Sequence, residues 1–163
     1  MPSTELQAVA DAIRADQRFW RNLVADVGTD RMDEPGPMGE WTFKDLAAHL
    51  AAWRNTRIPM IEAVARGAAL PDPPWPAGMT DDDEINAWFQ ERDAARSLDD
   101  VLDDYDQSFE RLAMAIEALP ENVARDPNAL PWAPGYVVIE TDFTEHLHEE
   151  HLPSIRAWLD GTS

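Results

Sequence analysis

The sequence predicts an all-α protein, an up-and-down bundle of four long helices in a single domain over residues 1–163. Three observations lead to this fold class. Apolar residues recur at helical spacing in long segments, loops rich in proline and glycine separate these segments, and the one short strand-like run has no partner strand. A chain of 163 residues commonly forms one domain and can bury a core without disulfides.

The first helix is expected over residues 4–27, with Ser3 or Thr4 as its N-cap. Its apolar face contains Leu6, Ile13 and Leu23, which recur at helical spacing. Gly28 follows as a stop signal. Proline and glycine then predict a loop over residues 32–40.

The second helix is expected to begin after Thr42, which can form a capping box with Asp45. It ends at Gly67, and Pro59 predicts a kink near its middle. The prolines of residues 70–78 predict a rigid loop.

A further helix is expected after Thr80 as its N-cap, with a break near Ser97. Ser97 and Asp100 form a new start signal, which predicts the next helix over residues 98–119. A long loop follows over residues 120–135. The last helix is expected over residues 138–159, with a kink at Pro153, and residues 136–139 are interpreted as its entry.

The composition is strongly acidic, with 13 Lys and Arg against 32 Asp and Glu and a formal net charge of -19. This balance argues against nucleic acid and anionic membranes as partners, because phosphate groups need a basic face. The charge either keeps the surface soluble or attracts cationic substrates and metal ions. The absence of cysteine excludes disulfides and thiolate zinc sites. With no signal peptide and no membrane span in view, we expect a cytoplasmic protein.

The four histidines are the most informative residues for function, and three of them lie within residues 146–151. In an α-helix, where successive residues turn by about 100°, His148 and His151 are about 60° apart on the core side. His146 falls about 140° from His151 in the same geometry and points elsewhere. His49 shares the inner face of the second helix with Leu46.

The imidazoles of His49, His148 and His151 are therefore expected to converge on one divalent metal. Imidazole binds zinc, nickel, iron and copper, and three protein ligands leave a position open for water or substrate. Glu149 or Glu150 can act as a catalytic base or orient a ligand.

Two alternatives to a metal site stay open at this point. An inward histidine is often a core residue with its hydrogen bonds satisfied, and His146 or His148 can be a polar surface residue. The tryptophans either pack in the core or line an apolar ligand pocket above the metal. They include Trp41, Trp53, Trp75, Trp88 and Trp132.

Residues 39–53, GEWTFKDLAAHLAAW, resemble the second-helix motif of the DinB/YfiT-like superfamily. Residues 84–86, EIN, and residues 148–159, HEEHLPSIRAWL, resemble its ClbS/DfsB branch more narrowly. The resemblance implies a four-helix bundle, often a homodimer, with one metal ligand on the second helix and two on the last. His49 matches the first ligand. The last-helix pair of the superfamily is commonly spaced i, i+4, whereas His148 and His151 are spaced i, i+3.

The resemblance also implies an enzyme that acts on a small molecule. The superfamily includes thiol-dependent transferases and isomerases, and the namesake of the ClbS/DfsB branch hydrolyses a cyclopropane in a genotoxin to protect its producer. We therefore expect a hydrolase or thiol transferase that uses zinc, nickel or iron. The alternatives are a bundle that sequesters a small molecule without chemistry and a structural homodimer.

Overall fold

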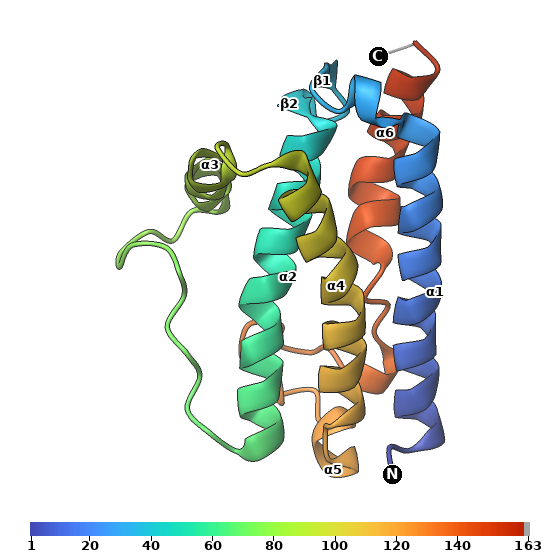
Figure 1. Cartoon of the computed structure of the whole chain (residues 1–163). Helices are drawn as coiled ribbons and strands as arrows, with labels where there is room; N and C mark the ends of the chain where they lie inside the picture. The colour runs from blue at the N-terminus through green and yellow to red at the C-terminus, as the bar shows by residue number, and fades with distance from the viewer. Residues whose placement is uncertain (162–163) are drawn as a thin grey trace.

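The computed structural model describes residues 1–161 and confirms the all-α bundle (Figure 1). The long helices α1, α2 and α4 lie side by side, and the last helical segment completes the bundle against α1. A two-stranded hairpin precedes α2, and α3 stands apart at one side of the bundle. The helical elements are α1 (Thr4–Val27), η1 (Thr29–Arg31), α2 (Phe43–Arg66), α3 (Asp82–Asp93), α4 (Leu98–Glu117), α5 (Glu121–Ala124), η2 (Val138–Glu140), η3 (His146–His151) and α6 (Leu152–Leu159).

Side-chain caps fix the starts of helices α1, α2, α3 and α4. The Ser3 hydroxyl accepts a hydrogen bond from the Leu6 amide at the start of α1. Thr42 and Asp45 form the expected capping box at the start of α2. Ser97 caps α4 as predicted. The cap of α3 differs from the prediction, because Asp81 rather than Thr80 accepts the bond from the Glu84 amide.

The all-α bundle is as predicted, but its helices do not strictly alternate up and down along the chain. Helices α2 and α4 both begin at the end of the bundle where the hairpin lies and run in the same direction (Figure 1), and a hydrogen bond between Asn55 and Asp104 joins them. Residues 67–81 and α3 connect the end of α2 to the start of α4. This connection runs back along one side of the bundle (Figure 1). Helices α1 and α4 run antiparallel and are joined by ion pairs such as Arg14 with Glu117.

The core lies between α1, α2, α4 and the C-terminal segment. The Trp20 ring stacks on Phe43 and meets Tyr105 edge to face, which ties three helices together. A smaller apolar cluster around Ile85 and Phe89 holds α3 against α2.

The hairpin was not predicted, because residues 32–40 contain only turn signals. Strands β1 (Pro35–Gly36) and β2 (Gly39–Thr42) pair antiparallel. Gly36 has a φ of 129°, and a Cβ there would lie 2.6 Å from Cδ1 of Trp158. The position therefore requires glycine, and the close contact fixes the hairpin against α6.

The prediction of one continuous last helix over residues 138–159 is wrong. Residues 138–140 form the separate turn η2, and the helical segment begins at His146. Its first part, η3, is π-helical and leads into α6, where Pro153 stands in the first turn and needs no amide partner. The π turn determines which histidines face the bundle interior.

Candidate metal site

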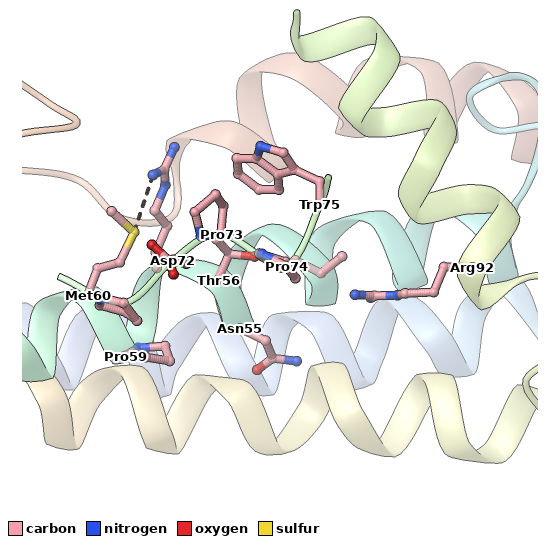
Figure 2. Close-up of a pocket in the computed structure, with 12 residues that line it drawn as sticks. Asn55, Thr56, Pro59, Met60, Asp72, Pro73, Pro74, Trp75 and Arg92 are labelled. Atoms are coloured by element: carbon pink, nitrogen blue, oxygen red, sulfur yellow. Dashed lines mark hydrogen bonds between the residues drawn. The ribbon is translucent and has the colours of Figure 1, made fainter. Parts of the chain in front are cut away.

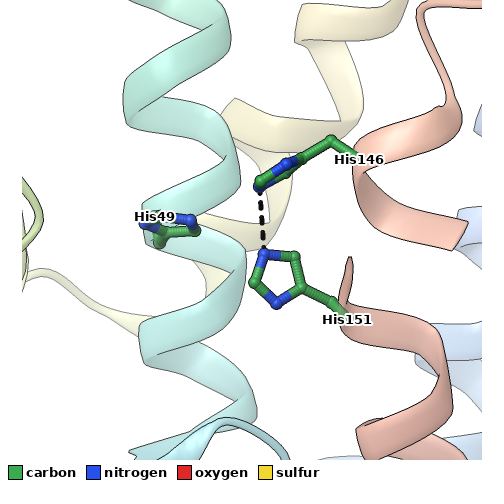
Figure 3. A group of neighbouring side chains, drawn as sticks. All are labelled: His49, His146 and His151. Carbon is green, nitrogen blue, oxygen red and sulfur yellow. Dashed lines mark hydrogen bonds between the residues drawn. The ribbon is translucent and has the colours of Figure 1, made fainter. Parts of the chain in front are cut away.

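Three histidines from two distant parts of the chain meet in one cluster (Figure 3), in which His49 and His151 are buried and His146 is exposed. His49 extends from α2, and His146 and His151 extend from η3. One ligand nitrogen from each side chain lies within 4.8 Å of the other two. The Nε2 atoms of His146 and His151 are 3.0 Å apart and share a hydrogen bond.

The π turn explains why His146 belongs to this group. In an α-helix, residues five apart differ by about 140° around the axis. A π-helix bonds residue i to residue i+5, so residues five apart lie one above the other. The insertion therefore moves His146 onto the face of His151, and the predicted separation of the two side chains does not hold.

His148 is turned away from the cluster, which corrects the expectation that it converges with His49 and His151. Its Nε2–H group donates to Oδ1 of Asp16 on α1, at 2.6 Å. The physical reason is again the π turn, because the α-helical spacing that put His148 beside His151 does not apply to residues 146–151.

The environment keeps these imidazoles neutral. Burial, with the neighbouring His151 and His146, lowers the pKa of His49 to about 4. Burial and the neighbouring His146 likewise lower the pKa of His151 to about 4, against the opposing effect of Glu150. Burial also lowers the pKa of His146. Neutral imidazole is the form that binds a metal.

The donor set fits a borderline divalent metal. The Nδ1 atom of His49 is buried and has no hydrogen-bond partner among residues 1–161, although such an atom costs about 1–3 kcal/mol when it is left unsatisfied. A metal ion is one partner that satisfies such a nitrogen. Imidazole nitrogens suit zinc, nickel and iron, and a three-histidine set leaves room for a further ligand.

The cluster lies in the wall of a cavity of about 540 Å³ between α2, α4 and the C-terminal segment. Its wall is largely apolar, with Trp53 and Trp132 among the lining residues. Glu150 also lines this cavity, whereas Glu149 does not. Of the two predicted bases, the structure therefore brings only Glu150 to the site. Asp45 forms the α2 capping box, as predicted, and accepts a hydrogen bond from Gln90.

Two arginines in this cavity were missed by the sequence-based prediction. The Arg57 guanidinium lies 5.4 Å from the Trp53 ring and 5.8 Å from the Trp132 ring. The Arg54 guanidinium lies 4.2 Å from the Phe109 ring. Neither forms an ion pair within residues 1–161. The sequence offered one indication of their role, because Arg54 and Arg57 follow His49 by five and eight residues on the same helix.

The other ten arginines either form ion pairs or are exposed to solvent, unlike Arg54 and Arg57. Seven arginines pair with carboxylates, and the remaining three are exposed on the surface. Arg57 is half-buried, and burial lowers its pKa, with Asp82 opposing this from a distance too long for an ion pair. In a chain with 32 Asp and Glu residues, Arg54 and Arg57 therefore have no carboxylate partner within residues 1–161, although Arg54 donates a hydrogen bond to Ser108.

A second cavity, of about 410 Å³, lies between α2 and the proline-rich segment (Figure 2). Pro71, Pro73 and Pro74 form one wall, and Asn55 and Thr56 form the other. His49, His146 and His151 do not line this cavity, so the metal site belongs to the cavity of about 540 Å³.

The sequence profile of the mycothiol maleylpyruvate isomerase N-terminal domain matches residues 13–149, most of the chain. The chain belongs to this family. The family is part of the DinB/YfiT-like superfamily, so the predicted superfamily is confirmed. The matched range includes His49 and His146 and ends before His151. No curated protein and no solved structure matches the chain.

Family membership and the geometry agree on the kind of site. The mycothiol maleylpyruvate isomerase N-terminal domain is a metal-associated, DinB-like enzyme fold, and the three histidines of this member can hold a metal ion. Every helix within residues 1–161 is too short or too polar to span a bilayer.

Proposed function

We propose that the protein is a metal-dependent enzyme that modifies a small anionic molecule by hydrolysis or by thiol transfer. The observation that carries this proposal is the convergence of His49, His146 and His151 in the wall of a cavity of about 540 Å³. Cavities of this size bind small molecules and cofactors. The family description, which names a mycothiol-dependent isomerase, supports the thiol-dependent chemistry.

A bound zinc, nickel or iron ion supplies Lewis acidity, which makes a water or a thiol a nucleophile at neutral pH. Glu150, the acidic residue closest in the chain to His151 and a part of the cavity wall, is the proposed proton acceptor. The apolar wall, which includes Leu112 and Leu130, limits the access of bulk water.

The substrate is proposed to be anionic because the positively charged Arg54 and Arg57 line the cavity. A guanidinium fork matches a carboxylate or phosphate group, and the aromatic rings beside it hold its plane. The narrower likeness to the ClbS/DfsB branch, with a protective hydrolysis of an electrophile, belongs to the same proposal. The proposal also includes the homodimer and the cytoplasmic location that the sequence leads us to expect.

The test of turnover uses an electrophilic carboxylic acid, maleate, with a low-molecular-weight thiol, and separately a carboxylated aryl ester. The zinc-loaded protein is expected to consume free thiol or release the phenol. The metal-free protein and His49→Ala are expected to do neither. Saturable binding that survives metal removal, with both probes recovered unchanged, would refute the enzyme and favour the sequestering bundle.

Arg57→Gln is expected to weaken binding of a carboxylate ligand by about 10–100-fold, because a hydrogen bond to a charged group contributes about 1.5–3 kcal/mol. Binding of the neutral amide of the same ligand should not change. Calorimetric titration of both ligands measures the difference. The matched control is Arg111→Gln, since Arg111 pairs with Asp104 outside the cavity. An equal loss for the acid and the amide would contradict recognition of the charge.

A further inference from the structure

A buried carboxylate on α1 has a single histidine as its partner. Asp16 is 5% exposed, and its Oδ1 atom accepts the hydrogen bond from His148. Its Oδ2 atom is buried and has no partner among residues 1–161. Phe19 packs on the same imidazole, with its ring centroid 4.6 Å away. A buried carboxylate is unfavourable unless it is paired, so its place in the apolar face of α1 needs an explanation.

Residues 146–151 form a π turn in the structure, and an α-helical turn is the alternative geometry for the same residues. With α-helical geometry, His148 would lie about 60° from His151 and face the site, and His146 would point away. With the observed π turn, His146 lies beside His151, and His148 faces α1. A change of register therefore exchanges one imidazole for the other.

We propose that Asp16 and His148 are positioning residues that hold residues 146–151 in the π register and thereby place His146 in the metal site. This inference rests on the proposed metal site. A π turn is rare and less favourable than continuous α-helix, so it persists only where other contacts stabilise it. The bond from His148 to Asp16 is such a contact, because hydrogen bonds to an ionised group are stronger than neutral ones.

The π register also explains why His148, although close in sequence to the metal ligands, does not enter the site. His148 is chemically able to replace His146, yet its Nε2 atom is engaged by Asp16. Asp16 therefore selects His49, His146 and His151 over the alternative set in which His148 takes the place of His146. Removing the carboxylate should release His148 toward the site.

Zinc affinity in a set of variants tests this selection. His146→Ala is expected to weaken zinc binding by more than about 100-fold, since the loss of an outer-shell group alone costs about 10–100-fold. Adding Asp16→Ala should restore at least about tenfold, because the released His148 enters the site. Adding Asp16→Asn, which keeps an acceptor for His148, should restore less. A double variant with Asp16→Ala that binds zinc no better than His146→Ala would overturn the proposal.

A measurement on the metal-free protein separates this inference from the proposed function. In the wild type, ¹⁵N-resolved imidazole spectra should show the hydrogen bond between His146 and His151. Asp16→Ala and His148→Ala should each abolish that signature while far-UV circular dichroism stays unchanged, and Asp16→Asn should retain it. An unchanged His146–His151 signature in both alanine variants would contradict the positioning role, whether or not the wild type binds zinc.

Discussion

His49→Ala and His151→Ala are each expected to weaken zinc binding by more than about 100-fold, the largest effect that the site predicts. Both side chains are buried, and one ligand nitrogen of each lies within 4.8 Å of the other members of the cluster. No other imidazole reaches the place of His49, because the remaining one, His148, is bound to Asp16. Competition with a chromophoric chelator at pH 7.5 measures the affinity.

Glu149→Ala is the matched control for these two variants. Glu149 is exposed, lies two residues from His151 and does not line the cavity. The Glu149→Ala variant should bind zinc within about twofold of the wild-type affinity. If zinc were bound by surface carboxylates instead, this variant would bind it more weakly. Retention of zinc by His49→Ala, with its helical content intact, would show that the metal does not bind at this cluster.

Acidification is expected to destabilise the metal-free protein through His49. The pKa of this imidazole is about 4 in the folded protein, against an ordinary value of 6.5 for histidine. Between these two values the unfolded chain binds a proton that the folded chain excludes, so the free energy of unfolding falls as the pH falls. At about 1.4 kcal/mol per unit, the loss amounts to about 3 kcal/mol once the pH reaches the folded value.

Urea unfolding at several pH values from 7.5 to 4.5 measures this effect, with His49→Gln as the control. Glutamine removes the titrating group and leaves the 32 carboxylates in place, so their contribution cancels in the comparison. The wild type should lose more stability than the variant over this window. Parallel curves for the two proteins would contradict a buried, neutral His49.

The helix framework was predictable because its signals are local. Ser3, Thr42, Ser97 and the glycines that follow helices act on their immediate neighbours, and the structure uses them nearly as expected. The direction of α4 relative to α2 was not predictable, because residues 67–81 contain prolines that show a loop and not where the loop leads.

The site was predictable only in part, for a geometric reason. His49 lies in regular helix, so its inward orientation follows from α-helical spacing. His146 and His148 lie in a π turn, for which that spacing assigns the wrong faces. One signal was present in the first helix. Asp16 follows Ile13 by three residues and precedes Trp20 by four, which places a carboxylate in an apolar face and indicates a buried partner.

The metal content of the untagged protein shows whether His49, His146 and His151 hold a metal ion. Protein purified without a histidine tag, and the same protein after incubation with zinc and removal of the excess, would be analysed by inductively coupled plasma mass spectrometry. We expect about one divalent metal per chain, bound at neutral pH and released as the pH falls toward 4, where His49 and His151 become protonated. Protein that holds no zinc, nickel or iron under either condition would contradict it.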